Sequence, residues 1–263
     1  MLTSPLGRAT SQPAPLLRVR GLTRSFARGL ARRKGGVLAL EDIDLELRSE
    51  DVVGIIGPEG AGKTTLLQCV AGLLRRDAGM VEWFGHLFPG GGSVPGVAYV
   101  PAVPVYYPFL TVRDVVEYRC ARESTRRPAA RAVQSAISRL SLDQRSETHV
   151  AALSPEELGR LAIAEVLSFD PEVLLVDTPP ATECAPLSDC ALDALREHAS
   201  SGGAVAIAAR HAHSVVRAAS RVIVLGEGKI LKSYCADEGG EKRLDPAFPM
   251  RTSGARFVAE RMH

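Results

Sequence analysis

The sequence has few cysteines and no long apolar run. Its five cysteines are an odd number and include no C-x-x-C pair: Cys69, Cys120, Cys184, Cys190 and Cys235. Such a set argues against a disulfide framework and against a zinc site, and it fits a reducing cytosol. The N-terminus lacks the apolar core of a signal peptide, and no run approaches the roughly 20 apolar residues of a membrane-spanning helix. We therefore expect a cytoplasmic chain that has no membrane span of its own.

Aromatic residues and net charge are also scarce. Phe, Trp and Tyr make up 5% of the chain, and 32 basic against 30 acidic residues leave a net charge of +2. Bulk charge therefore does not indicate a nucleic-acid-binding protein, and no aromatic-rich basic strip is present, so nucleic acid is not expected as a partner. The charge is uneven, because eight basic residues precede the first acidic residue, Glu41. This basic stretch could contact phosphate head groups or a partner, but solvated surface is the simpler interpretation.

The two ends of the chain differ in composition from its middle. Residues 1–15 contain three prolines and show no hydrophobic periodicity, which predicts a disordered arm. Residues 236–263 are polar and interrupted by Pro and Gly, which predicts a mobile tail with one short helix near its end. The chain is 46% hydrophobic, so residues 16–235 are long enough to bury a large core as one α/β domain, with or without a smaller lobe.

A phosphate-binding motif follows an apolar run at residues 52–56, which predicts a strand. The next residues fit G-x-x-x-x-G-K-[ST] and continue with a second threonine: Gly57, Pro58, Glu59, Gly60, Ala61, Gly62, Lys63, Thr64 and Thr65. In such a P-loop the glycines let backbone N–H groups point at phosphates, and the following helix adds the positive end of its dipole. Lys63 would reach the β- and γ-phosphates, and the Thr64 hydroxyl would bind Mg²⁺. The alternative is an ordinary glycine-rich turn.

Hydrophobic patterning predicts an α/β fold: a P-loop nucleotide-binding fold with a mainly parallel core sheet, an antiparallel β flank and a helical lobe. Residues 17–20 and 38–47 alternate in polarity, as half-buried antiparallel strands do, and would flank the strand before the loop. Residues 173–176 form an apolar run closed by Asp177, which is typical of a buried parallel strand whose acid emerges where ligands bind. Further strands are expected at 80–85, 97–100, 204–208 and 222–225, and helices within a lobe of about 102–170, at 187–198 and around 215–216.

The order of these motifs resembles the nucleotide-binding subunit of ATP-binding cassette (ABC) transporters, from about Leu16 to Lys232. The phosphate loop and Asp177 are two anchors of the resemblance. The others are residues 99–101 and 110–114 at the entry to the lobe, 153–154 and 160–164 at the signature helix, and His211 with 220–222 and 228–230 near the end.

The resemblance implies roles for individual residues. Phe26 lies where the family stacks an aromatic ring on adenine, although a strand-end core position explains it equally well. Thr64 and Asp177 would be directed at Mg²⁺, with ATP as the nucleotide. His211 would be the switch histidine that hydrogen-bonds the γ-phosphate, so Asp177 and His211 are the candidate catalytic residues. Ordinary surface is the alternative for His211.

Four departures from the family pattern put hydrolysis in doubt. Ala102 stands where the family has a glutamine that senses the transport partner, and Thr178 stands where it has the glutamate that polarises the attacking water. Pro155-Glu156-Glu157 replaces Gly-Gly-Gln in the signature, and Pro155 has no N–H to offer a γ-phosphate. Ser154 to Glu157 also fits a helix capping box, which is the interpretation we favour. Glu183-Cys184 replaces a Leu-Asp pair used across the dimer.

These features lead to one expected function with two alternatives. We expect the ATP-binding subunit of an ABC exporter, peripheral at the inner face of the cell membrane, with an integral membrane permease and a second cassette, identical or different, as partners. In the family, two subunits sandwich two nucleotides, and each site combines one chain's phosphate loop with the other chain's signature. Hydrolysis is expected to be weak or absent. The alternatives are a nucleotide-binding regulatory or scaffold protein and a P-loop ATPase that acts on nucleic acid.

Overall fold

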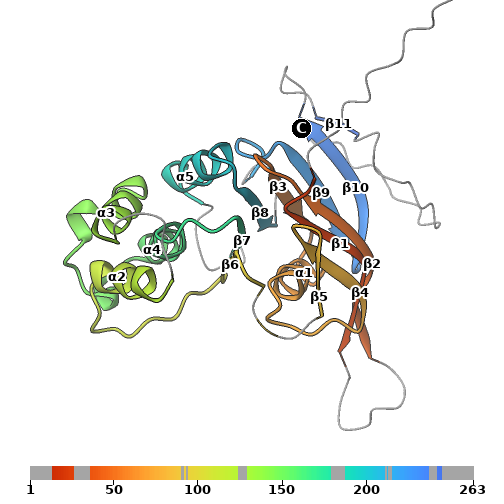
Figure 1. Cartoon of the computed structure of the whole chain (residues 1–263), viewed down its shortest axis with the longest axis horizontal. Coiled ribbons are helices and arrows are strands. Elements are labelled where there is room, and N and C mark those ends of the chain that lie inside the picture. The colour runs from red at the N-terminus through yellow and green to blue at the C-terminus, as the bar shows by residue number, and fades with distance from the viewer. Residues whose placement is uncertain are drawn as a thin grey trace, which may run out of the picture.

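A computed structural model of the protein describes residues 14–26, 36–89, 92, 94–123, 129–178, 187–210, 212, 215–236 and 242–244. Most of the expected N-terminal arm and most of the expected C-terminal tail therefore lie outside the described residues. Figure 1 shows the described part as two β-sheets on one side and a group of helices on the other.

A seven-stranded sheet forms the centre of the described chain, in the order β11-β10-β9-β3-β8-β7-β6. Its strands are β3 (Val52–Ile56), β6 (Val97–Val100), β7 (Val173–Asp177), β8 (Ala204–Ala209), β9 (Arg221–Gly226), β10 (Lys229–Ala236) and β11 (Lys242–Leu244). The strands from β9 to β6 pair in parallel, and β10 and β11 continue the sheet antiparallel. The apolar run at 52–56 is a strand, as predicted, and because β3 lies between β8 and β9, its carboxyl end opens at the middle of a mainly parallel sheet.

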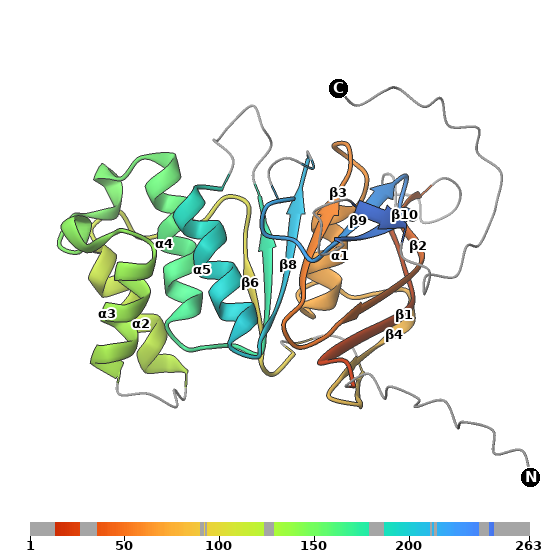
Figure 2. The same cartoon turned by 90° about the horizontal axis from the view of Figure 1, so that it is seen from above.

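A second, four-stranded sheet has the order β2-β1-β4-β5 and is antiparallel. Its strands are β1 (Leu17–Phe26), β2 (Val37–Leu47), β4 (Ala78–Trp83) and β5 (His86–Phe88). The expected antiparallel strands are present, but β1 and β2 do not pair with β3; they form a layer of their own. Helix α1 (Lys63–Val70) contacts β2 as well as β7 and β8, so it lies between the two sheets (Figure 2).

Helices cover the other face of the seven-stranded sheet, as Figure 2 shows. They are α2 (Val112–Arg122), α3 (Ala129–Arg139), α4 (Pro155–Leu167) and α5 (Asp189–Ser200), with short 3₁₀ turns at Asp143–Arg145 and Val150–Ala152. Helices α4 and α5 lie against the sheet, and α2 and α3 pack on α4. In the sequence α2, α3 and α4 fall between β6 and β7, which is where a helical lobe is expected. Among the described residues, no helix is both long and apolar enough to pass through a bilayer.

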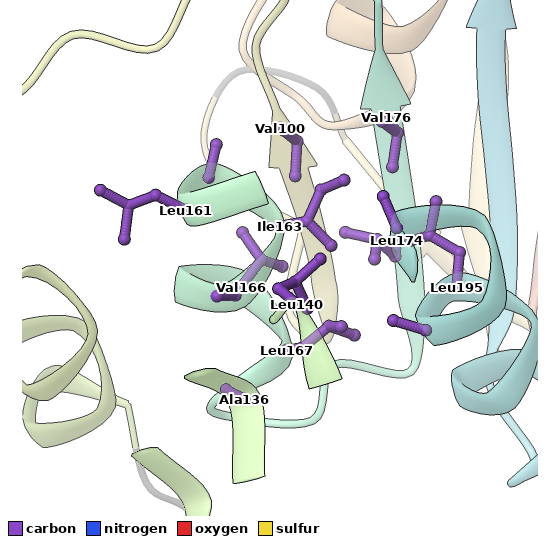
Figure 3. Packing of buried hydrophobic residues seen from close by; sticks show 14 of the residues in the cluster. Val100, Ala136, Leu140, Leu161, Ile163, Val166, Leu167, Leu174, Val176 and Leu195 are labelled. Atoms are coloured by element: carbon purple, nitrogen blue, oxygen red, sulfur yellow. The ribbon is translucent and has the colours of Figure 1, made fainter. Parts of the chain in front are cut away.

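The alternating faces of the strands divide the core into two clusters. Leu174 and Val176 of β7 face the helical lobe, whereas Val173 and Leu175 face α1 and the antiparallel sheet. Figure 3 shows α4 packed against β6 and β7, with Ile163 pointing toward Val100. Because side chains alternate along a strand, Asp177 faces the same side as Val173 and Leu175, toward α1. This parity places the carboxylate next to the phosphate loop.

Two details differ from the sequence-based expectation. Where a helix was expected around 215–216, the described residues form single helical turns: the N–H groups of Val216 and Ala219 donate to the carbonyl oxygens of Ala212 and Val215, at 2.9 Å each. Strand β11 lies inside the segment expected to be a mobile tail, where it pairs with the end of β10. A three-residue strand carries too little periodicity to be recognised in a polar stretch.

Candidate functional site

The loop between β3 and α1 is shaped by its glycines. A methyl group on Gly57 would come closer than 3.0 Å to the carbonyl oxygen of Leu225 in β9, and one on Gly62 would approach Ala39 of β2 as closely. Gly60 and Gly62 also have left-handed backbones, with φ of 77° and 101°, which favour glycine. The loop is therefore held tightly between β9 and β2, and α1 begins directly after it at Lys63.

The ammonium group of Lys63 lies inside this loop. Its Nζ atom donates hydrogen bonds to the carbonyl oxygens of Gly57 and Pro58, at 2.8 Å each. Burial lowers the pKa of Lys63, while the nearby Asp177 carboxylate opposes that shift. Lys63 thus places a positive charge at the N-terminus of a helix, where phosphate groups bind.

Asp177 ends β7 and is a buried carboxylate, with 4% of its surface exposed. Burial raises its pKa, and hydrogen bonds from Thr64 and Tyr99 and the charge of Lys63 act in the opposite direction. A carboxylate whose charge is disfavoured by burial is stabilised by a cation. The Thr64 hydroxyl beside it is a second oxygen ligand of the kind Mg²⁺ prefers, so these two residues fit a magnesium–nucleotide complex.

Phe26 lies at the end of β1 and is 39% exposed. The guanidinium carbon of Arg24 lies over its ring, 4.9 Å from the centroid. The exposed position excludes the alternative of a buried core residue, and it leaves ring surface available for stacking. An adenine-stacking role for Phe26 stays a prediction.

His211, the expected switch histidine, lies outside the described residues, as do Glu183 and Cys184. The preceding residue, Arg210, is close enough to Lys63 that its charge lowers the pKa of that ammonium. The chain therefore approaches the phosphate loop immediately before position 211.

Thr178 follows Asp177 and is engaged in holding two strands together. Its hydroxyl donates a hydrogen bond to the carbonyl oxygen of Ala208 at 2.8 Å, and its N–H donates to the same oxygen at 3.2 Å. A threonine hydroxyl does not act as a general base at neutral pH. Position 178 thus has a structural function between β7 and β8 and carries no group that would activate water.

The start of α4 is closed by the capping box expected from the sequence. The hydroxyl of Ser154 accepts a hydrogen bond from the Glu157 N–H at 3.2 Å, and the Glu157 carboxylate accepts one from the Ser154 N–H at 2.8 Å. Glu157 also pairs with Arg145 at 2.9 Å. These bonds lower the pKa of Glu157, the backbone bond from Ser154 most of all. The first turn therefore satisfies the N–H groups of Ser154 and Glu157 with its own side chains.

Removing this cap should measurably destabilise the protein. We expect Ser154→Ala to lower the free energy of unfolding by about 1 kcal/mol, the usual cost of losing an N-cap hydroxyl. Chemical denaturation of both proteins would measure the difference. Ser200→Ala is a suitable control, because Ser200 Oγ donates to the Arg196 carbonyl at the far end of α5 and caps no helix start. Equal stability of the Ser154 variant and the parent protein would contradict the capping assignment.

A cavity of about 150 Å³ lies beside Asp177, between the core sheet and the lobe. Residues that line it include Ala102, Pro155, Glu156, Gly159, Val176 and Ser188. Ala102 and Gly159 are small, so the space that a longer side chain at position 102 would enter stays open. The segment after Ala102 is exposed and apolar: Val103, Val105, Tyr107 and Phe109 are 60%, 88%, 69% and 67% exposed.

Two polar residues of the site are absent from the sequence-based assignment. Tyr99 donates a hydrogen bond to Asp177, and Gln68 of α1 bonds Tyr99. Gln68 lies four residues after Thr64, on the same face of the helix. That spacing is the signal that could have identified Gln68. The role of Tyr99 can be recognised only when it is known which side chains of β6 point toward α1.

Comparisons with known proteins agree with this arrangement. A sequence profile described as "ABC transporter" matches residues 40–181, more than half of the chain. The protein named "Ribose import ATP-binding protein RbsA 2" from Streptomyces avermitilis is 30% identical. The alignment, 265 positions long with its gaps, covers 94% of this chain and 51% of that protein. "Sulfate/thiosulfate import ATP-binding protein CysA 1" from Agrobacterium fabrum is 29% identical, with 84% of this chain and 64% of that protein covered. The chain spans about half the length of the first of these relatives.

Solved structures show the same fold. The dimeric bacterial ABC transporter cassette MJ0796 superposes with a TM-score of 0.72 at 18% identity, covering 83% of this chain and 98% of that one. The ADP conformation of the ATP-binding cassette MJ1267 gives 0.71 at 20% identity, with 87% and 94% covered. The α/β architecture with an antiparallel β layer and a helical lobe is that of ATP-binding cassettes.

Proposed function

The chain belongs to the ABC transporter family, and on that premise we propose that it is an ATP-binding subunit that holds MgATP at residues 57–65 and hydrolyses it slowly or not at all. The observation that carries the proposal is the arrangement of Lys63 in the glycine-lined loop beside the buried Asp177. When bound, Mg²⁺ would neutralise charge on the phosphate oxygens. The chain would contribute Lys63 to bind the phosphates, Thr64 and Asp177 to hold the metal, and Phe26 to stack on the base. Position 211, next to Arg210, is the proposed place of the switch histidine.

Slow hydrolysis follows from what the residues near the phosphates do. The Thr178 hydroxyl is bonded to Ala208 and supplies no base. The N-terminus of α4 is capped by Ser154 and Glu157, and Glu156 adds a carboxylate that is 51% exposed there and is only loosely paired with Arg160, at 3.8 Å. A carboxylate about 4 Å from a phosphate oxygen is repelled by roughly 4 kcal/mol near a protein surface. This helix start is therefore unsuited to binding a γ-phosphate held by a partner cassette.

The proposed partners are a membrane permease and a second cassette. Support for the permease comes from the exposed apolar segment at 103–109, since contiguous exposed apolar side chains mark interaction sites. In a homodimer both nucleotide sites would lack a base and a working signature. With a different second cassette that has an intact signature and glutamate, the site on this chain's phosphate loop would gain a signature but lack a base. The site on the partner's loop would have a base but lack a working signature. Each site would then keep one of the two features, so we propose a heterodimer. The proposed location is the cytoplasmic face of the membrane.

The direction of transport is a separate question. The relatives described above are named as import proteins, so their names favour import for this chain, in contrast to the export expected from the sequence. Transport assays with the permease in vesicles of defined orientation would decide between the two directions.

The proposal is tested by measuring MgATP affinity and turnover on the same preparation. Binding of a fluorescent ATP analogue should saturate in the wild-type protein and should fall at least 100-fold in Lys63→Ala, because a charge-assisted contact and the loop's own bonds are both lost. Lys232→Ala, at an exposed lysine of β10, is the matched control and should bind as wild type does. A wild-type protein that binds no nucleotide would refute the proposal. Turnover of about 1 per second or more, a usual value for an enzyme, would refute the slow-hydrolysis part.

A further inference from the structure

Four polar side chains meet between α1 and the carboxyl ends of β6 and β7. Thr64 and Gln68 come from one face of α1, Tyr99 from β6 and Asp177 from β7. Tyr99 pairs with Leu175 in the parallel register, and Asp177 lies two residues further along β7. Both side chains therefore point to the same face of the sheet, toward α1.

The hydroxyl of Tyr99 interacts with two other members of this group, Asp177 and Gln68. Its hydroxyl donates a hydrogen bond to Asp177 Oδ2 at 3.3 Å, and Gln68 forms a second hydrogen bond with the same hydroxyl. Burial, with the nearby Asp177 charge, raises the pKa of Tyr99 to about 12. Tyr99 therefore links the Asp177 carboxylate of β7 to helix α1 through its hydroxyl.

We propose that Tyr99 is a positioning residue for Asp177, and that its hydrogen bond holds this carboxylate in the orientation in which it binds the Mg²⁺ of the nucleotide complex together with Thr64. The inference rests on the proposed function, because it concerns the same metal. Carboxylates that bind metals are usually oriented by a second hydrogen bond from a neighbouring side chain. Gln68, in turn, holds Tyr99 and ties the arrangement to the helix that follows the phosphate loop.

A second partly buried tyrosine among the described residues provides a matched comparison. Tyr106 donates a hydrogen bond to Glu165 Oε2 of α4 at 2.7 Å. Burial raises the pKa of Tyr106 and of Glu165. The chemistry is the same as at Tyr99, but Tyr106 and Glu165 lie within the helical lobe, among α2, α4 and the segment before them. Removing either hydroxyl costs the fold one partly buried hydrogen bond, and only the Tyr99 hydroxyl acts on Asp177.

The test separates metal binding from nucleotide binding. A fluorescent ATP analogue is titrated into wild type, Tyr99→Phe and Tyr106→Phe, in EDTA and at increasing Mg²⁺ concentrations. In Tyr99→Phe the Mg²⁺ concentration for half-maximal enhancement of nucleotide affinity should rise about 10- to 100-fold, the usual effect of losing such an orienting partner. Affinity in EDTA should be unchanged. Tyr106→Phe should match wild type in both conditions.

Two outcomes would overturn the inference while leaving the proposed function intact. One is an unchanged Mg²⁺ dependence in Tyr99→Phe. The other is an equal loss of affinity with and without Mg²⁺, which would assign Tyr99 a purely structural function. If Tyr99→Phe does not fold, Gln68→Met, which removes the other partner of the phenol, should shift the Mg²⁺ midpoint in the same direction, and an unshifted midpoint there would also overturn the inference. A wild-type protein without nucleotide affinity would instead refute the proposed function, and this inference with it.

Discussion

In a chain that carries Pro155→Gly, Glu156→Gly and Glu157→Gln, the further substitution Thr178→Glu should raise ATP turnover by about 10²- to 10⁴-fold over the same chain with Thr178. This is the usual contribution of a general base. The glutamate would supply the base that position 178 lacks. The three signature substitutions would remove the proline ring and two carboxylates. Glutamine at position 157 would still complete a capping box with Ser154. Phosphate release at saturating MgATP would measure the gain.

The control for this experiment is Thr178→Gln in the same background. Glutamine has the size of glutamate but cannot accept a proton, and both variants lose the hydrogen bond between Thr178 and Ala208, at a cost of about 1 kcal/mol. A difference in turnover between the two would therefore reflect the base itself. If the glutamine variant were equally active, or if neither exceeded the parent, the explanation of slow hydrolysis given above would be wrong.

Gly57→Ala should destabilise the fold, whereas Gly159→Ala should stabilise it. The added methyl group at position 57 would overlap the carbonyl oxygen of Leu225 and would press on Ala61, so β9 or the loop must move; overpacking of this kind costs about 1 to 3 kcal/mol. Gly159 lies within α4 with no atom within 4 Å of an added methyl group, and alanine in a helix is favoured over glycine by about 0.5 to 1 kcal/mol. Replacing glycine by alanine is thus expected to lower the stability at position 57 and to raise it at position 159.

Thermal unfolding would measure this pair directly. In a domain of this size 1 kcal/mol shifts the Tm by roughly 2 to 4 °C, so the two variants should differ by several degrees, with the parent between them. Nucleotide affinity should also fall in Gly57→Ala and be unchanged in Gly159→Ala. A Gly57→Ala protein as stable as the parent would show that the loop is not held against β9 as the structure has it.

The sequence predicted those parts of the fold that depend on local patterns. The apolar run before Gly57, the run closed by Asp177 and the capping box at Ser154 are read from neighbouring residues, and each is where it was expected. The placement of β1 and β2 in a separate sheet depends on pairing with β4, about 60 residues away, which alternation alone does not specify. Such long-range contacts leave no trace in local periodicity.

The same limit applies to the site. Lys63 and Thr64 belong to a motif of fixed spacing and could be assigned without a structure. Tyr99 acts on Asp177, 78 residues away, and its role follows from strand register and from which face of β6 it occupies. Thr178 could be recognised as lacking a base, but only the structure shows that its hydroxyl is engaged with Ala208.

The apolar segment at 103–109 has a consequence for the cell that makes this chain. Every second side chain there is exposed, and Tyr107 and Phe109 stack on each other with ring centroids 5.5 Å apart. A surface of this kind promotes aggregation when nothing covers it. Copies made in excess of the proposed permease would be removed by precipitation or by quality-control proteases, so the amount of this chain that persists should follow the amount of that proposed partner.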